Sequence, residues 1–131
     1  MGDGHHGWAA AEIILFLLDC LVHEEGTTLS FFKDATAGMI PWGFNIYFKG
    51  IATSFGKVNC TLNYETERRA ICSISLDPVS EKKLRAVDIY LPFSIKRALT
   101  ATQGVDLQII PVQEKTKISC SSGNAVLLLE Q

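Results

Sequence analysis

The stretch "KVNCTLNYETERRAICSISL", residues 57–76, decides the fold of this 131-residue chain because it carries the clearest local pattern. Apolar and polar residues alternate on both sides of a charged tip, and a period of two is typical of strands with one buried face. The alternating apolar positions are Val58, Cys60, Leu62 and Tyr64 on one arm and Ala70, Cys72, Ile74 and Leu76 on the other. The pattern predicts an antiparallel hairpin with Cys60 directly opposite Cys72 on the buried face.

The segment after the hairpin, "DPVSEKKLRAVDIYL" at residues 77–91, is predicted to be a helix. Asp77 is a favourable N-cap residue, and Pro78 suits the first helical position. Pro92 lacks a backbone donor and clashes with the preceding turn, so we expect a break or kink in this central helix before Ser94.

Four further segments are predicted to be strands, because they are alternating or short apolar runs between turn residues. They are residues 44–50, 105–112, 115–120 and 125–130. Helices and strands that are segregated along a chain indicate an α+β fold. We therefore expect one domain over residues 1–131, in which a mainly antiparallel sheet packs in two layers against an N-terminal helix and the central helix. Residues 1–8 are expected to form a flexible tail.

The N-terminal helix is predicted over residues 9–25, within "AAAEIILFLLDCLVHEEG". At 100° per residue its charged positions gather in one narrow stripe and leave an apolar arc of roughly 280°. A surface helix usually buries a stripe a little over about 100° wide, so one sheet cannot cover this helix. Either the central helix or a second chain must cover Trp8, Leu15 and Val22. Since closed two-fold dimers are the commonest soluble oligomers, we expect a homodimer with these three residues at its interface.

Neither an export signal nor a membrane anchor is expected at the N-terminus. The first Lys or Arg is Lys33, which follows the apolar run instead of preceding it. A transmembrane helix needs about 20 apolar residues, and Glu12 and Asp19 interrupt this run. We therefore expect a soluble, cytoplasmic protein whose four cysteines stay reduced.

Composition and motifs exclude several function classes. A net charge of -2 does not favour nucleic-acid binding. Glycine-rich phosphate motifs are absent, and no residues stand out as a catalytic set, so no cofactor is predicted and an enzyme is not favoured. His5 and His6 could bind a metal weakly, but a solvated terminus explains them better, and no metal site is predicted.

The loop "MIPWGF", residues 39–44, is the best candidate for a binding site. Loops carry function more often than scaffold elements, and aromatic side chains can line an apolar pocket or an interaction surface. We therefore predict Met39, Trp42 and Phe44 as ligand- or partner-binding residues. The alternative is a hydrophobic plug that closes the edge of the core.

Two hypotheses of function follow. The first is a non-enzymatic binding or adaptor protein that acts as a homodimer and binds another protein. The second is a protein, and possibly a small enzyme, that holds a small apolar ligand between sheet and helix. A cavity of several hundred Å³ lined by Trp42 and Phe44, with a titratable group inside, would favour the second hypothesis.

Overall fold

The protein is described from a computed structural model, which defines residues 3–78 and 81–131, with side chains from Gly7 onward. These residues form one helix and ten strands. The elements are α1 (Asp3–Leu21), β1 (Val22–Glu25), β2 (Thr28–Phe31), β3 (Ile46–Thr53), β4 (Gly56–Thr66), β5 (Arg69–Pro78), β6 (Ala86–Leu91), β7 (Arg97–Thr100), β8 (Leu107–Val112), β9 (Lys115–Cys120) and β10 (Ala125–Glu130).

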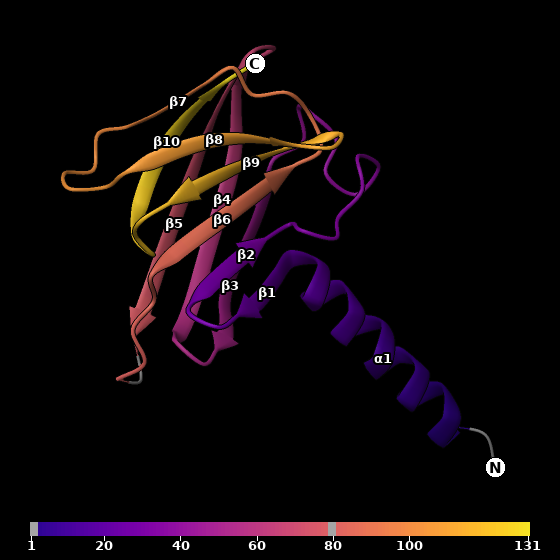
Figure 1. The fold of residues 1–131 in the computed structure, drawn as a ribbon. Helices are drawn as coiled ribbons and strands as arrows, with labels where there is room; N and C mark the ends of the chain where they lie inside the picture. The colour runs from indigo at the N-terminus through magenta and orange to yellow at the C-terminus, as the bar shows by residue number, and fades with distance from the viewer. Residues whose placement is uncertain (1–2, 79–80) are drawn as a thin grey trace.

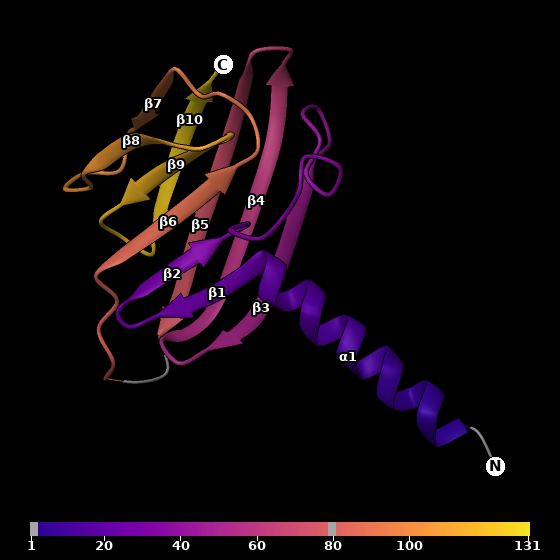
Figure 2. The same ribbon diagram turned by 45° about the vertical axis from the view of Figure 1, so that its right-hand side comes forward.

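The strands form two five-stranded sheets that face each other as a sandwich (Figures 1 and 2). One sheet has the order β1-β2-β6-β9-β8 and the other has the order β3-β4-β5-β10-β7. The predicted α+β fold with two layers of sheet and helix is therefore wrong. Each sheet buries its inner face against the other sheet, so the core needs no helical layer.

The predicted central helix over residues 77–91 is also wrong. Pro78 ends β5, and Ala86–Leu91 forms β6 in the middle of a sheet. Val87 and Leu91 are four residues apart and fit one helical face, but with Ile89 they also fit one strand face, and all three are fully buried. β6 pairs in parallel with β2 and antiparallel with β9, and pairing with these two strands makes the segment a strand instead of a helix.

The hairpin prediction is confirmed, but its register differs. β4 and β5 pair antiparallel, and Cys60 and Cys72 both lie on the buried face. Cys60 lies opposite Ile74, so the pairing is shifted by two residues from the predicted one. A shift by two preserves the buried face, and the sequence pattern alone therefore cannot exclude it. A bulge between Tyr64 and Thr66 contributes to the register.

The other four strand predictions are confirmed, by β3, β8, β9 and β10. Fully buried side chains from both sheets fill the core between them, among them Phe31, Leu62, Ile89, Ile118 and Leu127. The sheet orders place β1 and β3 at one edge of the sandwich and β7 and β8 at the opposite edge.

The N-terminal helix exists, but it does not pack as predicted. α1 runs from Asp3 to Leu21, so it includes part of the predicted tail, and residues 1–2 lie outside the described residues. It projects away from the sandwich beside the β1 edge (Figures 1 and 2). Residues 22–25 form β1 instead of the last helical turn, because β1 pairs with β2.

Candidate functional site

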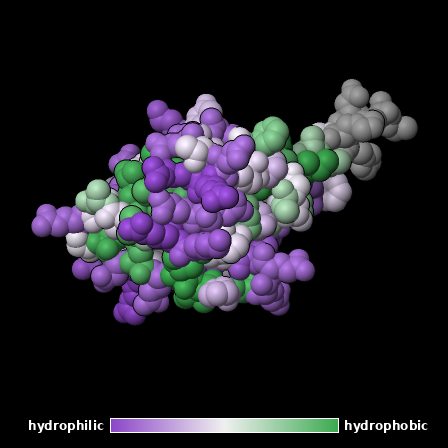
Figure 3. Space-filling model, turned by 90° about the horizontal axis from the view of Figure 1, so that it is seen from above, coloured by the Kyte–Doolittle hydropathy of each residue, from purple (hydrophilic) through white to green (hydrophobic). Residues whose placement is uncertain are grey.

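The apolar surface of α1 is the most unusual feature of the described residues. Seven large apolar side chains on this helix are exposed: Trp8, Ile13, Ile14, Leu15, Phe16, Leu17 and Leu18. Their exposed fractions range from 68% at Trp8 to 37% at Leu18, nearest the sandwich. Figure 3 shows hydrophobic groups toward this projecting helix, whereas hydrophilic groups predominate on the end of the sandwich that faces the viewer. Soluble monomers rarely expose a continuous apolar surface of this kind.

The structure separates the three residues that were predicted at an interface. Trp8 and Leu15 are exposed on α1, where another molecule can reach them. Val22 is only 8% exposed, because it lies in β1 opposite Phe31 and packs in the core. The sequence did not place Val22 correctly, because the helix ends one residue before it.

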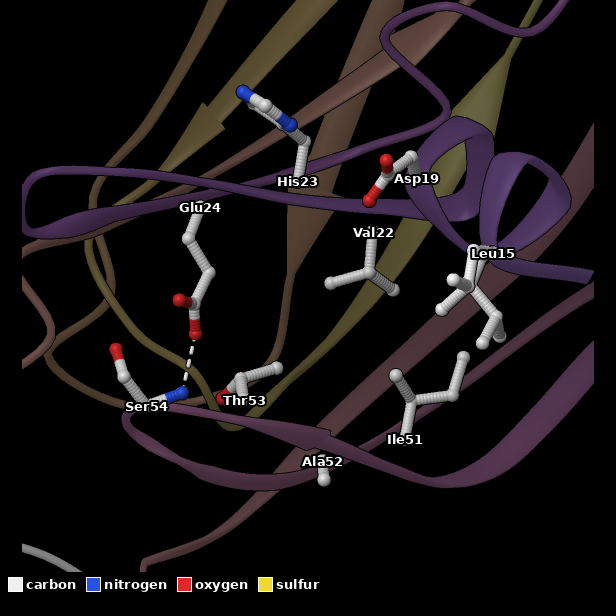
Figure 4. A pocket seen from close by; sticks show the side chains of 10 residues that line it. Leu15, Asp19, Val22, His23, Glu24, Ile51, Ala52, Thr53 and Ser54 are labelled. Atoms are coloured by element: carbon white, nitrogen blue, oxygen red, sulfur yellow. Dashed lines mark hydrogen bonds between the residues drawn. The ribbon is translucent and has the colours of Figure 1, made fainter. Parts of the chain in front are cut away.

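A groove of about 510 Å³ lies at the base of α1, between the end of the helix, β1 and β3 (Figure 4). Leu15, Val22 and Ile51 contribute its apolar wall. Asp19 and Glu24 also line it, and they make the groove acidic. The Glu24 carboxylate accepts a hydrogen bond from the backbone N–H of Ser54, which joins the edge strands of the two sheets.

An ion pair lies at the end of β1, one residue after the groove residue Glu24. Lys33 donates a hydrogen bond to the carboxylate of Glu25, at the end of β1. This hydrogen bond lowers the pKa of Glu25 and raises the pKa of Lys33. The pair links β1 to the segment after β2, and because both groups are partly exposed its contribution to stability is small.

The 39–44 loop acts mainly as a plug of the core. Trp42 packs edge-on against Tyr64 and Phe93, with ring centroids 4.6 and 4.7 Å apart, and its Nε1 donates a hydrogen bond of 2.8 Å to the carbonyl of Glu67. The two other predicted binding residues point outward, since Met39 is 40% and Phe44 is 67% exposed. Trp42 and the buried Ile40 thus anchor the loop, and Met39 and Phe44 are its accessible side chains.

Sequence reasoning missed a second apolar surface, on the outer face of β5, β10 and β7. Leu128 lies directly opposite Ile71 on one side and Leu99 on the other. Together with Val126 they form what we call the β10 patch, which lines a shallow cleft of about 500 Å³. The signal was present in "AVLLLE", because a strand with apolar residues at successive positions places some of them outside.

Within residues 3–78 and 81–131, no cluster of three or more His, Cys, Asp or Glu residues could hold a metal ion. The side chains of His5 and His6 lie outside the described ones. Over the same part of the chain, no helix has the length and apolar character needed to cross a membrane.

Comparison of the chain with protein-family models, with curated proteins and with solved structures yields no match. The candidate site therefore depends on the geometry of this chain alone.

Proposed function

We propose that this protein is a non-enzymatic binding module that associates with a second copy of itself through α1. The observation that carries the proposal is the row of seven exposed apolar side chains between Trp8 and Leu18. A helix that is apolar around most of its circumference is normally buried, and within the described chain these side chains are not.

The area and its chemistry support association. These side chains expose on the order of 800 Å² in total, which is about the area that each partner contributes to a stable interface. Covering half of that area would stabilise the complex by on the order of 10 kcal/mol, before the cost of association. Trp8 and Phe16 are large aromatic residues of the kind that dominate binding energy at interfaces.

Sedimentation equilibrium of the full chain tests the proposal. We expect the wild type to exceed the monomer mass at micromolar concentration, and the Leu15→Glu variant to remain monomeric. The matched control is Gln108→Glu, which places the same charge on an exposed position of β8 and should associate like the wild type. A wild type that stays monomeric at high micromolar concentration would contradict the proposal.

The small-ligand hypothesis has weaker support. It required a cavity lined by Trp42 and Phe44, but the rings of Tyr64 and Phe93 pack directly against Trp42. The Phe44 side chain is exposed and is not turned toward the rings that pack against Trp42. It therefore remains available for binding another protein.

A further inference from the structure

We infer that α1 of one copy docks on the β10 patch of the next copy, so that the chains join head to tail. This inference rests on the proposed self-association and names the surface that receives the helix. It depends on three properties of the described residues: the shape of the patch, the charges around it, and its position relative to α1.

The patch is a flat apolar row that crosses three strands. Ile71, Leu128 and Leu99 lie side by side because Leu128 pairs with both of the others in the antiparallel ladders. Val126 extends the row along β10 and is 51% exposed, and Leu99 at the sheet edge is 41% exposed. Sheet faces in contact with water normally carry polar side chains, so this row indicates a surface that is covered in an assembly.

The charges beside the patch complement those of α1. The next row of the same face consists of Arg69, Glu130 and Arg97, and Glu130 forms ion pairs of 3.0 Å with Arg69 and 3.6 Å with Arg97. Two cations therefore share one carboxylate, which leaves an excess positive charge. α1 contains no Lys or Arg, and Glu12 and Asp19 give it negative charge. A positive row along one side of the apolar row suits an apolar helix whose formal charges at neutral pH are all acidic.

The groove at the base of α1 is a poorer acceptor for the same helix. Asp19 and Glu24 line that groove, and they would repel the acids of a second α1. Its apolar wall also includes Leu15, which belongs to the projecting helix itself. Charge therefore selects the β10 patch over the groove.

The position of the two surfaces requires a second molecule. α1 leaves the sandwich beside β1, whereas β7 lies at the opposite edge, and the helix points away from it in both views (Figures 1 and 2). The helix of one copy thus cannot reach its own patch. A contact between two different surfaces is heterologous, and it leaves one free helix and one free patch on every dimer, so the assembly can grow.

Mixing two variants tests the inference. Leu15→Glu removes the helix surface and keeps the patch, and Leu99→Glu removes the patch and keeps the helix. We expect each variant alone to be folded, to remain monomeric, and to lose self-affinity by about 100-fold or more.

An equimolar mixture of the two variants should form a complex with one chain of each kind, because neither end of that complex can extend. Val126→Glu repeats the patch arm if Leu99→Glu does not fold. The control is Gln108→Glu, at an exposed position of β8 in the opposite sheet.

The outcomes distinguish the inference from the proposed function. Patch variants that self-associate like the wild type would overturn the inference and leave self-association through α1 intact. Monomeric variants whose mixture stays monomeric would also overturn it. A Leu15→Glu variant that self-associates like the wild type would overturn the proposed function, and the inference with it.

Discussion

The indole of Trp42 meets the ring of Phe93 edge-on, with centroids 4.7 Å apart and planes at 88°. These two residues are far apart in the chain and come from two loops, one before β3 and one after β6. The contact joins these two loops, and the hydrogen bond from Trp42 to the carbonyl of Glu67 fixes the indole in place. Aromatic pairs in this geometry contribute energy beyond the area they bury.

Trp42→Ala should therefore destabilise the fold by about 3 kcal/mol, because it removes both ring contacts and leaves a void. Phe44→Ala is the matched control from the same loop, and we expect a change within about 0.5 kcal/mol because Phe44 is exposed. Urea unfolding of both variants provides the measurement. Equal losses would show that Trp42 does not anchor this loop.

Gly56→Ala should destabilise the protein strongly. Gly56 has a φ of +138°, and an added Cβ would lie 2.1 Å from the backbone oxygen of Asp77 on the paired strand. Backbone strain and this clash together predict a cost of about 3 kcal/mol or more. Gly104 also has a positive φ, but a Cβ added there would meet open space. We therefore expect Gly104→Ala to lower the free energy of unfolding by only about 1 kcal/mol. Thermal unfolding of the two variants compares them, and a smaller loss at Gly56 would contradict the clash.

Tyr64 should make the fold sensitive to alkaline pH. Burial raises the pKa of Tyr64 to about 12, and its hydroxyl has no hydrogen-bond partner among the described residues. The unfolded chain has a tyrosine pKa of about 10. The pKa of Tyr64 is thus higher in the folded state than in the unfolded chain. The neutral Tyr64 side chain therefore contributes fully to the free energy of unfolding below pH about 10, and this contribution is lost as the pH rises toward about 12.

Tyr64→Phe should thus raise the urea midpoint of unfolding at both pH 8 and pH 11, and the increase should be larger at pH 11, where the ionisation of Tyr64 in the unfolded chain adds to it. The phenyl ring keeps the contact with Trp42 and removes the unpaired hydroxyl. Unfolding midpoints at the two pH values measure the effect. A constant difference between the variants at both values would refute the role of this ionisation.

Glu25→Gln should lower stability at neutral pH but not in acid. Lys33 lowers the pKa of Glu25 in the folded state, so the carboxylate stabilises the fold above its unfolded pKa of about 4.3. That contribution is lost as the pH falls through the folded pKa. The gap between wild type and variant should also shrink in 1 M salt, because both groups are partly exposed. Chemical unfolding at neutral and acid pH, with and without salt, measures the difference in stability between the wild type and the variant. A difference that persists in acid would contradict the role of the ion pair.

The sequence by itself determined the elements whose patterns are local. The period-two alternation of residues 57–76 predicts β4, β5 and their buried faces without any other part of the chain. The apolar run from Ile13 to Leu18 likewise predicts a helix that needs cover from several sides. Both signals are properties of consecutive residues, and a single sequence is sufficient to show them.

Only the tertiary structure decided the elements whose pattern fits two periods or depends on distant partners. Val87 and Leu91 suit a helix or a strand, and the neighbouring β2 and β9 make the segment a strand. The pairing of Leu128 with Leu99 and Ile71 created the β10 patch from three separate segments. Strand partners, and the faces they expose, are set by long-range packing, because a sheet gains its hydrogen bonds and its core only when all its strands are present.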